Sequence, residues 1–172
     1  MHVHIEVTRR QSLTAGIMGM LCASAATAKD RFIRGPIPNL ILKGPPLSLA
    51  VPDFLAEGVQ DRQVAVDIAQ LAGGILKRSG PFALIDAEGI DDKMADAGAI
   101  PKFAAWRPYN VDVLVVGQVS ELPDNRLQVD VRAWAVAARW QFMGQRLTAQ
   151  ATAWQRIGYA IAADIYERVR DD

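Results

Sequence analysis

Histidine and cysteine are nearly absent from this sequence of 172 residues, which contains only His2, His4 and Cys22. All three lie near the amino terminus, so the larger part of the chain has no imidazole and no thiol. That part is therefore unable to form a disulfide, a Ser–His or Cys–His nucleophile, or a zinc site of the usual ligands. The formal net charge is zero, which gives no electrostatic reason to expect nucleic acid as a partner.

Motifs for catalysis and phosphate binding are missing as well. The sequence has no G-x-S-x-G elbow and no G-K-[S/T] phosphate loop. Asp86, Glu88, Asp91 and Asp92 are close enough in sequence to suggest a site for a hard cation, but their spacing does not fit an EF-hand loop. A solvated acidic loop is the favoured interpretation. We expect no enzymatic activity, no cofactor and no metal.

The first 28 residues have the three-part pattern of an export signal. Arg9 and Arg10 precede an apolar run at 13–23, and an A-x-A sequence ends at Ala28. The run is shorter than the roughly 20 residues of a membrane-spanning helix. The alternative is a buried apolar amino-terminal helix. Cleavage after Ala28 would place the protein in the periplasm, remove every histidine and cysteine, and leave a net charge of −1, since Arg9, Arg10 and Glu6 depart with the signal. The Sec and twin-arginine export routes both stay open.

Residues 29–46 are predicted to form an extended arm. Six prolines and glycines interrupt this segment, and basic residues flank an apolar stretch at 37–42. Proline blocks helix formation and also blocks a central strand, so an edge-like or mobile arrangement is expected.

Hydropathy patterns from residue 47 onward predict a globular domain, and the 51% hydrophobic content is enough for a core. Strands are expected at 47–51, 82–85, 111–117, 127–133 and about 141–147. Helices are expected at 61–79, where Asp61 is the cap, briefly after Pro101, and after a capping box made by Thr152 and Gln155. The order β-α-β-(α)-β-β-β-α predicts an α/β fold with one mixed sheet covered by helices.

The two long helices each have one apolar stripe. In the first helix, the stripe is expected to contain Val64, Ile68, Leu71 and Ile75. In the last helix, it is expected to contain Trp154, Ile157, Ile161, Ile165 and Val169. Arg156, Asp164, Glu167 and Arg168 are expected to lie mostly off that stripe.

The four tryptophans are Trp106, Trp134, Trp140 and Trp154. Core packing is the default for aromatic residues in regular elements, although four indoles could also make a stacking platform. Trp140 lies in a predicted hairpin turn, so it is the best candidate for an exposed binding residue.

From about residue 47 to 170, the chain resembles the N-terminal domain of the TolB family of the bacterial Tol–Pal system. The resemblance depends on the order and spacing of several short pieces rather than on a single motif. These pieces are Val51-Pro52-Asp53-Phe54, Arg78-Ser79-Gly80, Phe82, Ile85-Asp86, Pro101, Trp106, Asp112, Val115 to Val119, Trp154, Arg156 and Ala163 to Glu167.

The resemblance implies a three-layer α/β domain with a mixed sheet of about five strands, similar to the anticodon-binding domain fold, and no enzymatic activity. In the family, the arm docks onto TolA by strand addition, and a following propeller binds Pal. The corresponding partner-binding residues here would be Phe32, Ile33, Ile37, Leu40, Ile41 and Leu42. Because the sequence ends at Asp172, Pal binding is expected only if a propeller is supplied elsewhere. A role peripheral to the membrane, in envelope integrity and division, follows.

Two other functions stay open. One is an exported small-ligand binder, with a site near Asp53 at a strand end and the loop after Gly117, because α/β domains often bind ligands there. For Asp53, a turn or helix-capping role is the simpler interpretation. The other is a nonfunctional fragment of a longer gene product.

Overall fold

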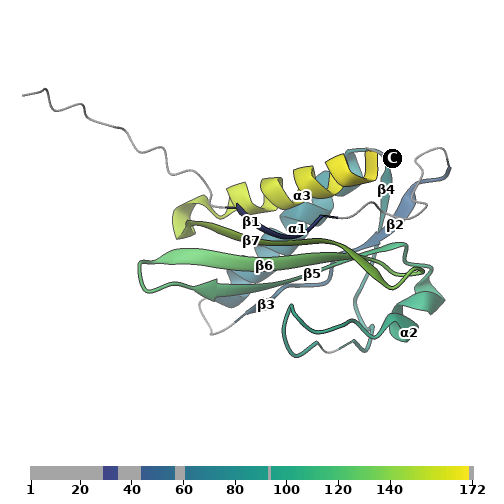
Figure 1. The fold of residues 1–172 in the computed structure, drawn as a ribbon, viewed down its shortest axis with the longest axis horizontal. Helices are drawn as coiled ribbons and strands as arrows, with labels where there is room; N and C mark the ends of the chain where they lie inside the picture. Colours follow the sequence, from purple (N-terminus) through teal and green to yellow (C-terminus); the bar gives the residue numbers. More distant parts are fainter. Residues whose placement is uncertain (1–28, 35–43, 57–60, 93, 171–172) are drawn as a thin grey trace, which may run out of the picture.

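Seven strands form one mixed sheet in the computed structural model, which describes residues 29–34, 44–56, 61–92 and 94–170 (Figure 1). The predicted signal at 1–28 lies outside the described residues. The elements in chain order are β1 (Lys29–Arg34), β2 (Leu47–Ala50), β3 (Leu55–Ala56), α1 (Asp61–Arg78), β4 (Phe82–Ile85), α2 (Phe103–Trp106), the 3-10 helix η1 (Arg107–Tyr109), β5 (Val113–Glu121), β6 (Arg126–Ala135), β7 (Trp140–Gln150), the 3-10 helix η2 (Ala151–Ala153) and α3 (Gln155–Arg170).

The spatial order of the sheet is β1-β7-β6-β5-β2-β4, and β3 also pairs with β5. Strands β5, β6 and β7 form an antiparallel meander, whereas β2 runs parallel to β4 and β5. The predicted fold class is confirmed. The sheet has two strands more than expected, because β3 is too short to show a period and β1 belongs to the segment interpreted as an arm.

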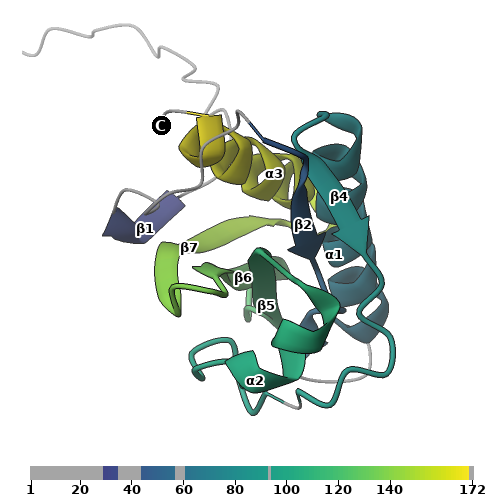
Figure 2. The same cartoon turned by 90° about the vertical axis from the view of Figure 1, so that its right-hand side faces the viewer.

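Helices α1 and α3 cover one face of the sheet, and α2 with the loop before it covers the other (Figures 1 and 2). The α1/α3 side holds the larger hydrophobic core, and the α2 side holds a smaller one. Strand β5 contributes Val113 and Val115 to the first core, and Leu114 and Val116 to the second. The nearly continuous apolar sequence of this strand is thus explained by burial on both faces.

The buried face of α1 differs from the expected one. Ile68 is buried as predicted, but Val64, Leu71 and Ile75 are only half-buried. Three of the six buried positions of α1 are alanines, whose small side chains allow the helix axis to approach the sheet closely. The backbone of Asp61 begins α1, while its side chain, and therefore its capping role, lies outside the described set.

The last helix confirms the isoleucine stripe but contradicts two details. Ile157, Ile161 and Ile165 are fully buried. Thr152 lies in η2, and α3 begins only at Gln155, so the predicted capping box is wrong. Asp164 was expected off the apolar stripe but is only 3% exposed. Its side chain belongs to a buried polar cluster described below.

Gly117 in β5 leaves room for the ring of Phe54, in the segment between β2 and β3, and both of these strands run parallel to β5. A Cβ atom at this position would lie 2.7–2.8 Å from three ring atoms of Phe54. Phe54 directly follows Pro52 and Asp53, so this contact sets where those two residues lie. Gly73 in α1 is different: a Cβ there would meet Val51 and Leu84 at 3.5–3.6 Å, which is ordinary van der Waals contact.

We predict opposite effects for alanine at these two glycines. Gly117→Ala forces the Phe54 ring to move and should lower the free energy of unfolding by about 1–3 kcal/mol. Gly73→Ala fits the available space and should raise it by about 0.5–1 kcal/mol, because alanine favours the helix. Urea unfolding of both variants beside the parent measures the difference, and the same sign for both would contradict this packing.

Candidate functional site

The arm begins as a strand at the edge of the domain's own sheet. β1 pairs antiparallel with β7, from Lys29 opposite Leu147 to Arg34 opposite Met143. Of the predicted partner-binding residues, Phe32 and Ile33 lie in β1. Ile37, Leu40, Ile41 and Leu42 lie outside the described residues. The first six residues of the segment expected to be an arm thus form the terminal strand of the sheet, and the arrangement of the whole arm stays a prediction.

The outer edge of β1 is open, although its sequence and pairing disfavour the addition of a further strand. β1 is the terminal strand of the sheet, and within the described part of the chain no strand pairs with its other edge. The pairing register shifts between Arg31 and Ile33, and three of the six residues are basic. Bulges and charged residues are features by which proteins protect an edge strand from adding another chain.

A buried polar cluster lies between α3 and the strand that pairs with β1. The Asp164 carboxylate accepts a hydrogen bond from Gln145 Nε2 at 2.6 Å and pairs with Arg168 Nε at 3.1 Å. Arg168 Nη1 also donates to the carbonyl of Phe142. Gln145 is the β7 residue opposite Arg31 of β1. The cluster thus joins α3 to the part of β7 on which the arm lies.

Sequence reasoning missed this cluster, although its position could have been read from periodicity. Gln145 is in phase with Met143 and Leu147, two core residues of the same strand. Asp164 lies three residues after Ile161, on the same side of the helix. Polarity alone placed Asp164 outside, whereas the period of the helix places it inside.

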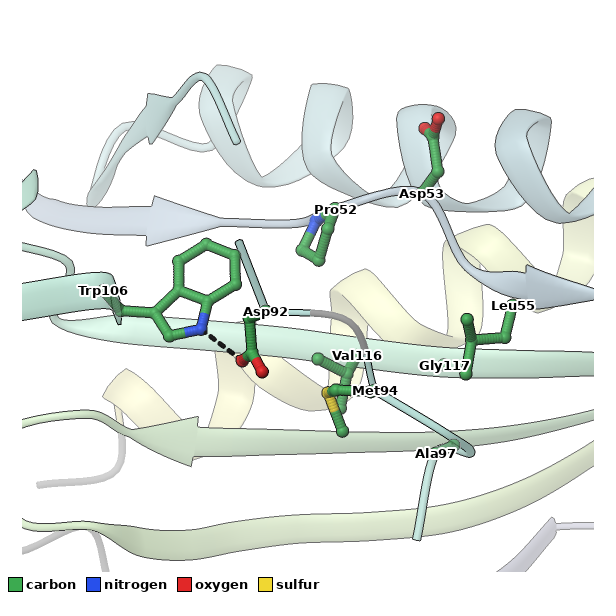
Figure 3. Close-up of a pocket in the computed structure, with 9 residues that line it drawn as sticks. All are labelled: Pro52, Asp53, Leu55, Asp92, Met94, Ala97, Trp106, Val116 and Gly117. Carbon is green, nitrogen blue, oxygen red and sulfur yellow. Dashed lines mark hydrogen bonds between the residues drawn. The ribbon is translucent and has the colours of Figure 1, made fainter. Parts of the chain in front are cut away.

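A second candidate site lies where the parallel strands end (Figure 3). It is a cavity of about 200 Å³ on the α2 side of the sheet, lined mainly by apolar groups. The lining residues are Pro52, Asp53, Leu55, Asp92, Met94, Ala97, Trp106, Val116 and Gly117. Asp92 accepts a hydrogen bond from Trp106 Nε1 at 2.6 Å, so this carboxylate is engaged within the wall. Figure 3 shows the Asp53 carboxylate pointing away from the apolar lining.

A polar hollow lies next to this cavity and shares Pro52 and Asp53 with it. Its other lining residues are Val51, Gln70, Asp86, Ala87 and Glu88. Asp86 caps the local turn by accepting from the Glu88 backbone N–H at 2.9 Å. Among the described residues, no cation pairs with the carboxylates of Asp53, Asp86 or Glu88.

The expected ligand site near Asp53 and Gly117 therefore coincides with a real cavity, with one correction. No loop follows Gly117, because β5 continues to Glu121. The loop residues that line the cavity come instead from the segment around Met94 and Ala97. That segment has no periodic pattern, so sequence analysis had no signal for its contribution.

The structure also bears on the acidic residues and the tryptophans that the sequence suggested as binding sites. Within the described ranges, no three His, Cys, Asp or Glu side chains lie close enough together to hold a metal ion. Trp106 and Trp134 are buried in the smaller core, which rules out a platform of four indoles. Trp140 is 45% exposed, as expected for a hairpin residue, and a binding role for it stays a prediction. None of the described helices has the length and apolar character needed to cross a membrane.

Comparisons with known proteins point to one family. The model of the TolB amino-terminal domain matches residues 44–142. The Tol-Pal system protein TolB of Paramagnetospirillum magneticum is 32% identical over 166 residues, which cover 96% of this chain and 37% of that protein. The chain thus spans little more than a third of this relative's length.

Two solved structures share the fold. The crystal structure of TolB from Acinetobacter baumannii has a TM-score of 0.58 and 16% identity, and the match covers 83% of this chain and 31% of that one. A hypothetical protein of Chlamydia trachomatis has a TM-score of 0.50 and 12% identity, over 72% of this chain and 98% of that one. At these identities, the likeness concerns the fold alone.

We predict that charge removal is costly only in the buried cluster. Asp164→Asn leaves Arg168 without its ion-pair partner in a site with little solvent, and should lower the free energy of unfolding by about 3 kcal/mol. Asp124→Asn breaks the exposed pair with Arg126, in which both side chains are more than 40% exposed, and should cost less than about 1 kcal/mol. Chemical denaturation measures both, and equal losses would refute the special role of the cluster.

Proposed function

The chain belongs to the TolB amino-terminal domain family, and on that basis we propose that it is a non-enzymatic protein–protein interaction module of the Tol–Pal envelope system. In this proposal, its arm, residues 29–42, binds the periplasmic domain of TolA by strand addition. The role is in envelope integrity and cell division. The observation that carries the proposal is the family match together with an arm whose first residues already have strand conformation.

The geometry of β1 supports a binding role for the arm. A segment in strand conformation at a sheet edge offers backbone N–H and C=O groups at the spacing that a second strand requires. β1 starts at Lys29, which directly follows the proposed cleavage site after Ala28. Export and cleavage would therefore leave this strand at the new amino terminus in the periplasm.

The arm has one side already occupied, which decides how it would bind. Its inner side pairs with β7, and the register shift between Arg31 and Ile33 disfavours pairing on its outer side. We infer that the arm leaves β7 when it pairs with TolA, so that the partner's edge strand replaces β7 as its neighbour. The buried cluster around Asp164 keeps α3 on β7 when the arm is away.

Pal binding is not part of this proposal for the chain by itself. In the family, that contact belongs to the propeller, and the present chain spans 37% of its full-length relative. A propeller supplied by another segment or another chain would be needed for it.

Removal of residues 29–42 should abolish binding to the periplasmic domain of TolA while the domain stays folded. Alanine should be placed at all six apolar residues of the arm, which are Phe32, Ile33, Ile37, Leu40, Ile41 and Leu42. This variant should bind about tenfold or more weakly, because the apolar side chains that would be buried against TolA are removed. The matched control is alanine at Arg31 and Arg34, which should mainly slow association in a salt-dependent way. Titration calorimetry measures affinity, and thermal unfolding checks the fold. Unchanged affinity after the deletion would refute the proposal.

A reversible cross-link tests the inferred movement of the arm. Asp30→Cys together with Arg146→Cys places two thiols at directly opposite positions of β1 and β7. Oxidation should lock the arm on β7 and suppress TolA binding, and reduction should restore it. Full binding by the oxidised form would mean that TolA adds to the outer side of β1. Each single cysteine variant serves as a control for the loss of the replaced side chain.

A further inference from the structure

We propose that the apolar cavity and the polar hollow on either side of the Pro52-Asp53 segment form one docking site. Its occupant is a segment of a partner protein that carries an apolar side chain next to a basic one. The site is separate from the arm. The order of the sheet puts β1 at one edge and β4 with β2 at the other, as Figure 2 shows.

The size of the cavity favours a single side chain. Its volume of about 200 Å³ is below the range of about 300–1,000 Å³ in which sites for whole small molecules usually fall. It is larger than the roughly 150 Å³ that accommodates a benzene ring. Pro52, Leu55, Met94 and Val116 offer this occupant an apolar lining, so a leucine-sized or aromatic side chain is the best fit.

The negative charge of the hollow favours a basic residue next to that apolar side chain in the occupant. The neighbouring hollow contains Asp53, Asp86 and Glu88, and its described lining residues include no basic one. All three carboxylates are exposed and have no ion-pair partner among the described residues. A lysine or arginine in the occupant would face three acceptors of opposite charge. The cavity and the hollow share Pro52 and Asp53, so adjacent side chains of one segment can reach both.

The walls of the cavity are held in place before anything binds. Asp92 fixes the Trp106 indole by the hydrogen bond at 2.6 Å. It also accepts from the backbone N–H of Lys102, at 3.2 Å from its Oδ2 atom. The contact of Phe54 with Gly117 sets the position of the chain just after Asp53. Such preorganisation lowers the entropic cost of binding.

Three blocked hexapeptides test the proposal on the full chain. The first carries a leucine followed by an arginine, the second a leucine followed by a glutamate, and the third a serine followed by an arginine. Binding is followed by NMR through the indole N–H of Trp106 and the methyl group of Met94. We expect saturable shifts with the first peptide. Affinity should be about fivefold or more lower for the second, and about tenfold or more lower for the third.

Variants of the protein then test whether the polar hollow binds the basic side chain of the peptide. Asp53→Asn with Glu88→Gln removes two exposed charges that make no hydrogen bond through their side chains among the described residues, so the fold is not at risk. This pair should weaken the leucine–arginine peptide by about fivefold or more and leave a leucine–serine peptide unchanged. The matched control is Glu167→Gln, an exposed carboxylate on α3, a helix that contributes no residue to the cavity or to the hollow.

Three results would overturn the inference. They are the absence of saturable shifts at millimolar peptide, equal affinity for the leucine–glutamate peptide, and binding of phenethylamine as tight as that of the peptide. The last result would mark a small-molecule site instead. Deletion of residues 29–42 should leave peptide binding unchanged, so failure of this site and failure of TolA binding by the arm are separate results.

Discussion

The burial of strand β5 on both faces is the constraint from which the rest of the structure follows. Residues 113–117 are all buried, and the side chains at 113–116 lie alternately in the α1/α3 core and in the α2 core. Each large apolar side chain buried in this way contributes about 1.5–3 kcal/mol. A single helical layer would leave half of these side chains in water. The loop before α2, which has little regular structure, therefore serves as part of the second cover, and its residues Asp92, Met94 and Ala97 line the cavity.

One candidate site lies at an edge of the sheet, and the other lies where its parallel strands end. At one edge, β1 ends the sheet and leaves a strand that is joined only to β7. At the other side, the parallel strands β2 and β4 end in loops, and their carboxyl ends border the acidic hollow. Buried polar contacts support both places: Asp164 with Gln145 behind the arm, and Asp92 with Trp106 in the cavity wall. Asp164 and Gln145 line neither the cavity nor the hollow, whereas Asp92 and Trp106 also line the cavity proposed to hold the partner's side chain, and each contact holds a neighbouring element in position.

Much of the fold was predictable because its signals are local. The apolar run of β5, the alternation in β6 and the isoleucine stripe of α3 each predict their element from a few consecutive residues. Where polarity and periodicity conflicted, polarity misled, as at Asp164, which is buried because Arg168 and Gln145 satisfy its carboxylate. Met94 and Ala97 had no signal at all, because a loop residue reaches a cavity through the path of the backbone rather than through a repeat. The location of a cavity near Asp53 was predictable from the rule on strand ends, whereas the presence of a separate acidic hollow beside the apolar cavity was not.

The sequence by itself determined the family, the order of the two long helices and the five predicted strands, and the scarcity of catalytic side chains, because these depend on residue type and on spacing along the chain. Only the tertiary structure decided three other properties. They are the strand with which the first residues of the arm pair, the carboxylates that have partners inside the domain, and the carboxylates that line a shared hollow. Those properties depend on distances between residues far apart in sequence, such as Arg31 and Gln145, or Asp53 and Glu88. The packing of helices and loops on β5 sets these distances, and a linear pattern does not contain them.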